Sequence, residues 1–236
     1  KDKQGEARAV LRREDPSFQT TVARETGQLL IAGMGELHLE VLRNKLVRDM
    51  KLNVKVGTPR VAYRETITTT AEAEGRFIRQ TGGRGQYGVV MLRVDPTPAD
   101  EQVHGEPIRI INEIKQGAIP TEFISSVEGG IRDAATSGPL SGYQMVNIDV
   151  TLLDGKHHPV DSSELAFERA GALGFEEGVR RAEPVYLEPI MHLEVMTPET
   201  YLGPVNADLS ARRAEISKME QRGSMRKLTA KVPLAS

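Results

Sequence analysis

Residues 146–179 read VNIDVTLLDGKHHPVDSSELAFERAGALGFEEGV, and the spacing of the apolar residues changes along this stretch. From 146 to 152 every second residue is apolar, which predicts a half-buried strand. Between Leu165 and Val179 the apolar residues fall at helical spacing, which predicts a helix with one apolar stripe. A strand followed by a polar loop and a helix favours a fold of mixed layers.

The same two patterns recur on both sides of that stretch. Helical spacing predicts helices over residues 1–14, 36–50, 123–134 and 205–216. An extended segment is expected at 61–67. Alternation and β-forming residues predict strands over residues 18–22, 28–32, 52–56, 71–80, 89–94, 108–111, 190–195 and 227–232. Because 13 prolines and 22 glycines favour several small domains over one large core, the predicted fold class is α+β with more than one domain.

The overall charge attracts no particular partner. Lysine and arginine number 31 against 33 aspartates and glutamates, so any nucleic-acid binding must come from local patches. Cysteine is absent, which excludes disulfides and thiolate metal sites. The sequence has neither a cleavable hydrophobic leader nor an apolar run of about twenty residues. We therefore expect a soluble protein of the cytoplasm that does not associate with a membrane.

Two polar loops are the best candidates for a binding site. The first is the glycine-rich segment 81–88, and the second is the histidine-containing segment 154–163. Glycine permits a close approach of the backbone to another surface, and arginine, glutamine, lysine and histidine supply donors for phosphates and base edges. The candidate RNA-contacting residues are Gly83, Arg84, Gln86, Tyr87, Lys156, His157 and His158. A plain hairpin turn and two surface histidines without a role are the alternatives.

Neither loop has the features of a nucleotide site. A P-loop needs a glycine upstream of its Gly-Lys-Ser/Thr, whereas Gly155 and Lys156 are followed by His157 and lack that glycine. The run 82–88 lies between two predicted strands, whereas a dinucleotide fingerprint begins a helix. We therefore expect no nucleotide-binding site in this chain.

A hydrolase is the alternative from a different class of protein. His158, Asp161 and Ser162 are the residue types of a serine-hydrolase triad. Their position immediately before an apolar helix instead favours Asp161, Ser162 or Ser163 as the residue that caps its N-terminus. We therefore expect no catalytic residue in this chain.

Two other polar groups are weaker candidates. Glu36, His38 and Glu40 resemble a metal cluster, but on a helix the two glutamates share a face from which His38 points away, so no metal site is expected. Basic residues between 212 and 227 are most simply a solvated surface, with RNA or an acidic partner as the alternative.

A series of motifs resembles the elongation factor G family, the ribosomal translocases. Each motif alone is weak, but together they span nearly the whole chain in the family's order. The matching segments are residues 14–18, 25–28, 33–40, 61–66, 81–88, 160–167 and 187–191.

The resemblance implies three domains from the C-terminal half of that family. Residues 1–66 are similar to the third domain, a ferredoxin-like sandwich whose first strand is expected before residue 1. Residues 67–183 resemble the fourth domain, a ribosomal-protein-like βαβ fold that enters the decoding centre and mimics the anticodon arm of tRNA. Residues 184–236 resemble the fifth domain, a second ferredoxin-like sandwich that is expected to continue beyond the sequence.

The resemblance also implies roles for the two loops. Arg84, Gln86 and Tyr87 match the family's first tip loop, and His158 matches its tip histidine, so contact with mRNA, A-site tRNA or ribosomal RNA is implied. The implied function is tRNA–mRNA translocation, with the ribosome and an N-terminal GTP-binding domain as partners, and GTP and magnesium are implied to bind in that domain and not in this chain. Pro159 stands where an acidic residue is common. This departure leaves open a relative that acts in ribosome recycling or protection, and an RNA-binding module unrelated to GTPases is a third possibility.

Overall fold

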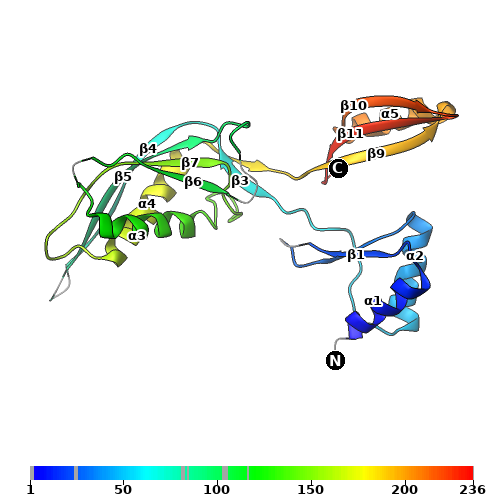
Figure 1. Cartoon of the computed structure of the whole chain (residues 1–236), viewed down its shortest axis with the longest axis horizontal. Helices are drawn as coiled ribbons and strands as arrows, with labels where there is room; N and C mark the ends of the chain where they lie inside the picture. Colours follow the sequence, from blue (N-terminus) through cyan, green and yellow to red (C-terminus); the bar gives the residue numbers. More distant parts are fainter. Residues whose placement is uncertain are drawn as a thin grey trace. The chain divides into compact units, whose positions relative to one another are not determined.

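The computed structural model describes residues 3–23, 26–80, 83, 85–102, 106–115 and 117–235 (Figure 1). The chain divides into two compact units, Lys1–Ala62 and Tyr63–Ser236. Both units combine helices with small sheets, which confirms the α+β class. In the described part of the chain, no helix has both the length and the apolar character needed to cross a lipid bilayer.

The first unit packs two helices and a two-stranded antiparallel sheet around a small core. Its elements are α1 (Lys3–Glu14), β1 (Gln19–Val22), β2 (Leu29–Ala32), α2 (Glu36–Asn44) and the π-helical turn η1 (Lys45–Asp49). The buried residues of the core are Ala7, Leu11, Phe18, Leu42 and Leu46. They come from both helices, the turn η1 and the entry to β1, so the helical spacing seen in the sequence marks the packed faces.

The strand predicted at 52–56 is wrong. Residues 51–63 form no regular element, and β1 and β2 pair only with each other among the described residues. A strand needs a hydrogen-bonded neighbour. Leu52 packs against the core of the first unit, so the alternation there reflects local packing and not sheet pairing.

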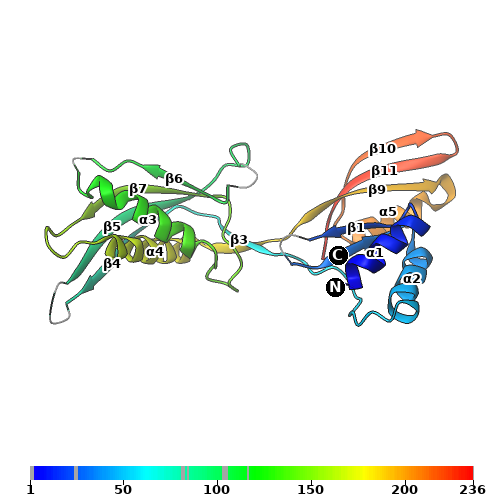
Figure 2. The same cartoon turned by 60° about the horizontal axis from the view of Figure 1, so that its bottom comes forward.

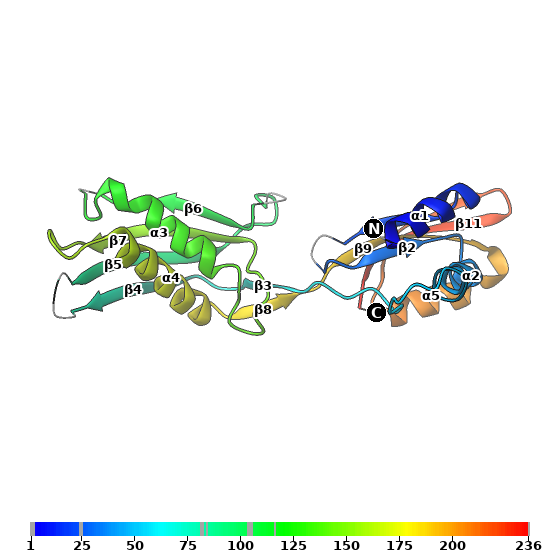
Figure 3. The same ribbon diagram turned by 90° about the horizontal axis from the view of Figure 1, so that it is seen from below.

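The centre of the second unit is a four-stranded sheet with two helices on one face (Figures 1 and 3). The spatial order is β4-β5-β7-β6, in which only β6 and β7 are parallel. The elements are β4 (Ala71–Arg79), β5 (Gln86–Pro96), β6 (Ile108–Asn112), α3 (Thr121–Ala134), β7 (Ile148–Lys156) and α4 (Glu164–Arg181).

The core of this domain lies between the sheet and the two helices. Phe167 of α4 stacks on Phe123 of α3 with ring centroids 5.0 Å apart, which ties the helices to each other. Fully buried side chains of β5, β7 and the helices include Val90, Leu92, Val94, Val150, Leu152, Val127, Ile131 and Phe167. Burial of this apolar surface is the main favourable contribution to the fold.

A short antiparallel ribbon pairs two strands of the second unit that lie far apart in the sequence. β3 (Arg64–Ile67) pairs with β8 (Pro184–Leu187), so the extended segment expected at 61–67 is a strand over its second half. The partner strand β8 was not predicted, because four residues that begin with a proline carry too short a pattern. The domain boundaries after residues 66 and 183 stay a prediction.

The last part of the chain is a three-stranded sheet with one α-helix (Figure 2). Its strand order is β10-β11-β9, and all neighbours are antiparallel. The elements are β9 (Ile190–Pro198), the short helix η2 (Glu199–Tyr201), α5 (Leu202–Ala211), β10 (Glu215–Arg222) and β11 (Met225–Pro233).

One helix prediction for this region is wrong in detail, and one strand was missed. The helix predicted to reach Ile216 ends at Ala211, and Ile216 lies in β10, which was not predicted. Arg213 takes a φ of 57°, a left-handed backbone that ends the helix and redirects the chain. Almost every residue of β10 is exposed, so the strand lacks the alternation that reveals a half-buried strand.

Candidate nucleic-acid interface

The sheet topology brings the two predicted loops to the same end of the domain (Figure 3). The last residue of β4, Arg79, pairs with the first residue of β5, Gln86. Three residues further along β5, Val89 pairs with Lys156, the last residue of β7. The turn after β4 and the loop after β7 therefore leave the sheet side by side.

Three of the predicted loop residues belong to strands. Gln86 and Tyr87 are the first residues of β5, and Lys156 is the last of β7, because ladder pairing continues further than the hydrophobic alternation does. Gly83 and His157 are exposed in the connecting segments, whereas Arg84 lies outside the described residues. Strand pairing thus fixes the backbone under part of the candidate site.

Hydrogen bonds join the two loops directly. The backbone N–H of Gly85 donates to the Asp161 carboxylate at 3.0 Å, and the N–H of Tyr87 donates to the Asp161 carbonyl at 2.8 Å. The Ser162 hydroxyl donates to the Tyr87 carbonyl at 2.9 Å. We call the described residues 83, 85–88 and 156–163 the paired loops.

His158 is presented to solvent with a defined tautomer. Its Nδ1 accepts hydrogen bonds from the backbone N–H groups of Val160 at 3.3 Å and Asp161 at 3.2 Å. A neutral imidazole that accepts at Nδ1 carries its proton on Nε2. The side chain is 48% exposed, and its ring centroid lies 6.0 Å from that of Tyr87. His158 therefore offers an N–H donor.

His157 has the opposite arrangement. Its Nδ1 lies 3.2 Å from the carbonyl oxygen of Ala118, and because a carbonyl only accepts, Nδ1 is the donor. Nε2 of the neutral ring is then an acceptor. The two adjacent histidines consequently differ in what they can offer a ligand.

Gln86 is oriented by Ser163, the residue that caps α4. The Ser163 hydroxyl accepts from the backbone N–H of Ala166 at 3.1 Å, which makes Ser163 the N-cap of α4, one of the three residues expected in that role. Its own proton is donated to the Gln86 side-chain oxygen. The Gln86 NH₂ group is then the end of the amide with free donor capacity.

The geometry gives no support to the hydrolase hypothesis. Ser162 is only 7% exposed. Its hydroxyl accepts from the His158 backbone N–H at 2.8 Å and donates to the Tyr87 carbonyl. The hydroxyl proton is thus directed at a backbone oxygen, whereas a triad nucleophile directs it at an imidazole nitrogen.

A third loop at this end was missed in the sequence. β6 is parallel to β7, so residues 113–115 and 117–120, which follow β6, begin at the same end of the sheet. Lys115 is exposed there, and Gly117 has a φ of +67° that favours glycine. The available signal was topological, since the segments that leave the carboxyl ends of parallel strands lie together.

His38, which was considered with Glu36 and Glu40 as a metal ligand, makes hydrogen bonds within the first unit. His38 accepts the Met34 backbone N–H at Nδ1, at 3.0 Å, and its Nε2 lies 2.5 Å from the Asp15 carboxylate. Both ring nitrogens are therefore engaged within the protein. In this arrangement His38 joins the start of α2 to the segment that follows α1.

Four of the five basic residues that stand out near the end of the chain, Arg212, Arg213, Arg226 and Lys227, form ion pairs. Arg212 lies 2.9 Å from Asp208, Arg213 lies 2.8 Å from Glu188, and Lys227 lies 2.8 Å from Glu194. Arg226 pairs with Glu199. Each of these cations has a nearby carboxylate, which favours the solvated-surface interpretation over a dedicated phosphate site.

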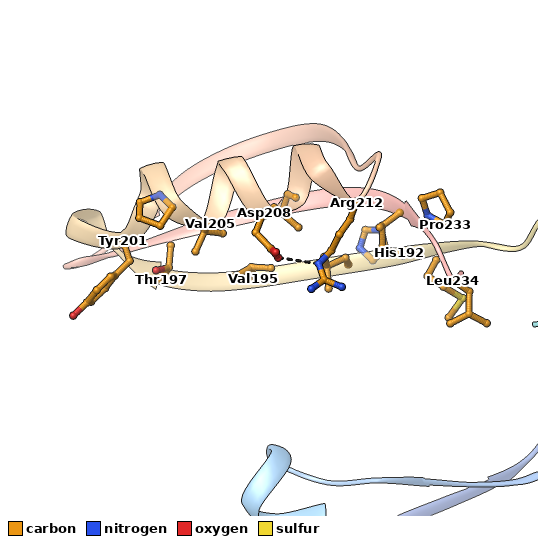
Figure 4. A pocket seen from close by; sticks show the side chains of 14 residues that line it. His192, Val195, Thr197, Tyr201, Val205, Asp208, Arg212, Pro233 and Leu234 are labelled. Carbon is orange, nitrogen blue, oxygen red and sulfur yellow. Dashed lines mark hydrogen bonds and ion pairs between the residues drawn. The ribbon is translucent and has the colours of Figure 1, made fainter. Parts of the chain in front are cut away.

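An apolar pocket of about 960 Å³ lies between α5 and the face of β9 (Figure 4). Side chains of Leu193, Val195, Val205 and Leu209 line it, and the Arg212–Asp208 ion pair lies at its side. These residues belong to the sheet-facing apolar layer of the last part of the chain. None of the predicted site residues that the structure describes lines this pocket.

The fold and the paired loops define a modular α+β protein that presents an exposed polar surface at one end of its central sheet. Family models match three consecutive segments of this chain. "Elongation Factor G, domain III" matches residues 1–58, "Elongation factor G, domain IV" matches residues 59–183, and "Elongation factor G C-terminus" matches residues 185–236. The chain belongs to the elongation factor G family.

Individual relatives agree with this assignment. Elongation factor G of Thermotoga neapolitana is 52% identical over 226 residues, which cover 96% of this chain and 32% of the relative. The Thermotoga maritima protein of the same name is 50% identical over the same coverage. A crystal structure of a Thermus thermophilus protein superposes with a TM-score of 0.78 at 41% identity, covering 99% of this chain and 34% of that one. The chain thus spans about a third of the length of these relatives.

Proposed function

We propose that this chain is the ribosome-contacting part of a translational GTPase that promotes tRNA–mRNA translocation. In this proposal the paired loops, with Arg84, contact mRNA, A-site tRNA or small-subunit RNA. The observation that carries the proposal is the direct hydrogen bonding of the two loops at one exposed end of the central sheet. Membership of the elongation factor G family supplies the biological setting.

The chemistry of the loops suits RNA. The Gln86 NH₂ group and the Nε2–H of His158 are donors for base edges or phosphate oxygens, and Lys156 adds a positive charge. Such contacts position one molecule on another without forming or breaking a covalent bond. A rigid domain that occupies the decoding site in this way blocks the backward movement of tRNA.

The remaining parts of the activity are assigned to the complete factor. GTP and magnesium bind in its GTP-binding domain, which is the intramolecular partner of this chain, and the ribosome is the external partner. The factor acts in the cytoplasm. We further propose that the domain boundaries lie after residues 66 and 183.

A chimeric factor tests the proposal. The matched region of the Thermotoga neapolitana relative is replaced by this chain, and a single round of translocation is timed on ribosomes. We expect Gln86→Ala and His158→Ala each to slow translocation about tenfold, the effect of losing one hydrogen bond to a charged group. Asp133→Ala, on the exposed side of α3, is the matched control and should translocate normally. Equal loss of translocation and ribosome-stimulated GTP hydrolysis would contradict a role specific to the loops.

A recycling or protection factor is the second candidate. It is favoured by Pro159, which stands where relatives commonly carry an acidic residue, and by the Lys156–His157 pair beside it. A chimeric factor that splits post-termination ribosomes but does not translocate would establish this alternative. One that translocates would exclude it as the main activity.

A further inference from the structure

Asp161 contacts both of the paired loops, although it was considered in the sequence only as a helix cap or as a member of a hydrolase triad. We propose that Asp161 is a positioning residue whose carboxylate and carbonyl hold the two loops together as one RNA-contacting surface. This inference rests on the proposed function of the paired loops. It adds a residue that touches no RNA but determines where two RNA-contacting side chains lie.

Asp161 takes the two backbone donors on either side of Gln86. Its carboxylate accepts the N–H of Gly85 at 3.0 Å, and its carbonyl accepts the N–H of Tyr87 at 2.8 Å. Gln86 is therefore fixed from both neighbours by a single residue of the other loop. A charge-assisted bond from a backbone N–H to a carboxylate is stronger than an ordinary hydrogen bond.

The same residue also orients His158. The Asp161 backbone N–H donates to Nδ1 of His158 at 3.2 Å. Asp161 thus connects the histidine with the backbone around Gln86. A displacement of Asp161 would change the position of both proposed contact residues at once.

Close packing around Gly85 holds the two loops at a short distance from each other. Gly85 is buried, and a Cβ atom on it would lie 3.0 Å from the Asp161 carboxylate carbon and 3.2 Å from the Arg79 carbonyl oxygen. Any larger residue at 85 would push the carboxylate away. The short distance between the loops therefore depends on glycine at this position.

Capping of α4 does not account for this arrangement. Ser163 is the N-cap and accepts the Ala166 N–H, whereas the Asp161 carboxylate accepts the N–H of Gly85. A second possibility is that the negative charge of Asp161 simply favours the helix N-terminus. Asp161→Asn separates the two, because it keeps an oxygen acceptor for Gly85 and removes the charge.

The first experiment measures amide hydrogen exchange in this chain by NMR. We expect Asp161→Ala to raise the exchange rate of the Gly85 amide about tenfold, the loss of one hydrogen bond. Asp161→Asn keeps an acceptor but loses the charge, so it should raise that rate clearly less than Asp161→Ala does, and the Asp133→Ala control should leave it at the wild-type value. Unchanged Gly85 exchange in Asp161→Ala would overturn the inference, as would equal acceleration by Asp161→Asn.

The second experiment uses the chimeric factor described above. We expect Asp161→Ala to slow translocation about tenfold while GTP hydrolysis on the ribosome persists, and Asp161→Asn to restore the rate. If Asp161→Ala does not fold, Gly85→Ala tests the same contact with Asp161 intact, and it should also slow translocation. Thermal unfolding of each variant establishes that it is folded.

The outcomes separate this inference from the proposed function. If His158→Ala slows translocation and neither Asp161→Ala nor Gly85→Ala does, the positioning role is overturned and the proposed function stands. If Asp161→Asn is as slow as Asp161→Ala, charge and not hydrogen bonding is responsible, and the inference also fails. If His158→Ala, Gln86→Ala and Asp161→Ala all translocate normally, the proposed function fails and the inference fails with it.

Discussion

The carboxylate of Glu65 accepts the backbone N–H of Ser141 at 2.9 Å in a fully buried site. It also accepts the N–H groups of Leu140 at 2.9 Å and Tyr143 at 3.0 Å. Glu65 lies on β3, so this one carboxylate fastens the β3–β8 ribbon to the loop that follows α3. Its negative charge is compensated by three converging N–H dipoles.

We expect Glu65→Ala to lower the free energy of unfolding by about 3 kcal/mol, because three buried N–H groups lose their acceptor. Glu65→Gln should cost less, since the amide oxygen still accepts from two of them. Urea unfolding measures both, with the exposed Glu74→Ala on β4 as the control. A Glu65→Ala variant as stable as this control would show that the buried hydrogen bonds contribute nothing.

Two adjacent glycines of α3 provide a matched pair of substitutions. A Cβ on Gly130 would lie 2.0 Å from the Glu168 carbonyl oxygen of α4, whereas a Cβ on Gly129 would meet nothing within 4 Å. Gly130→Ala should therefore force α3 and α4 apart and cost at least about 3 kcal/mol of the free energy of unfolding. Gly129→Ala should add about 0.5 to about 1 kcal/mol, the difference in helix propensity. Similar melting temperatures for the two variants would contradict the close packing of these helices.

Helices and strands were predicted best from the sequence where one face of the element is buried, because the apolar residues then recur at a regular spacing. The strand and helix of residues 146–179 were found for this reason, because Val150 and Leu152 and then Phe175 and Val179 face one core. β10 has almost no buried residue, so its sequence shows no alternation of apolar and polar residues. The alternation at 52–56 came from the packing of side chains alone, without a paired strand. Local spacing reports which side chains are buried, but it does not report whether a backbone has a pairing partner.

The candidate site was only partly predictable for a related reason. Residue types identified the two loops, since glycines and donors gather there. That the loops meet depends on the long-range pairing of Val89 with Lys156, which no local pattern encodes. The contacts of Asp161 with the glycine-rich loop were hidden because an acidic residue before a helix is ordinarily a cap, and the actual cap, Ser163, stands two residues later.

Capping by Ser163 can be tested separately from RNA contact. Ser163→Ala removes the acceptor for the Ala166 N–H and should lower the free energy of unfolding by about 1 kcal/mol. Ser163→Thr keeps the hydroxyl and should recover most of the loss. The same two variants test whether Ser163 orients Gln86. Ser163→Thr can still donate a hydrogen bond to the Gln86 side-chain oxygen, whereas Ser163→Ala cannot. Thermal unfolding in which Ser163→Thr is no more stable than Ser163→Ala would contradict the assigned cap.

The Asp15 carboxylate makes the first unit sensitive to acid. The Ser17 hydroxyl donates to it at 2.5 Å and His38 Nε2 lies 2.5 Å away, and these contacts, that of Ser17 first, hold the pKa of Asp15 below the ordinary aspartate value of 3.8. A carboxyl group with a lowered pKa in the folded state stabilises the fold above its unfolded pKa. That contribution is lost as the pH falls through the lower folded pKa.

We therefore expect Asp15→Asn to destabilise residues 3–62 at neutral pH, with a difference from wild type that shrinks once the pH falls below 3.8. Ser17→Ala should raise the pKa of Asp15 toward its ordinary value, because it removes the largest cause of the shift, and Ser17→Thr should not. An NMR titration of the Asp15 carboxyl carbon measures the pKa, and unfolding at a series of pH values measures stability. An Asp15 pKa at or above 3.8 in the wild-type chain would refute both expectations, because no stability could then be linked to its ionisation.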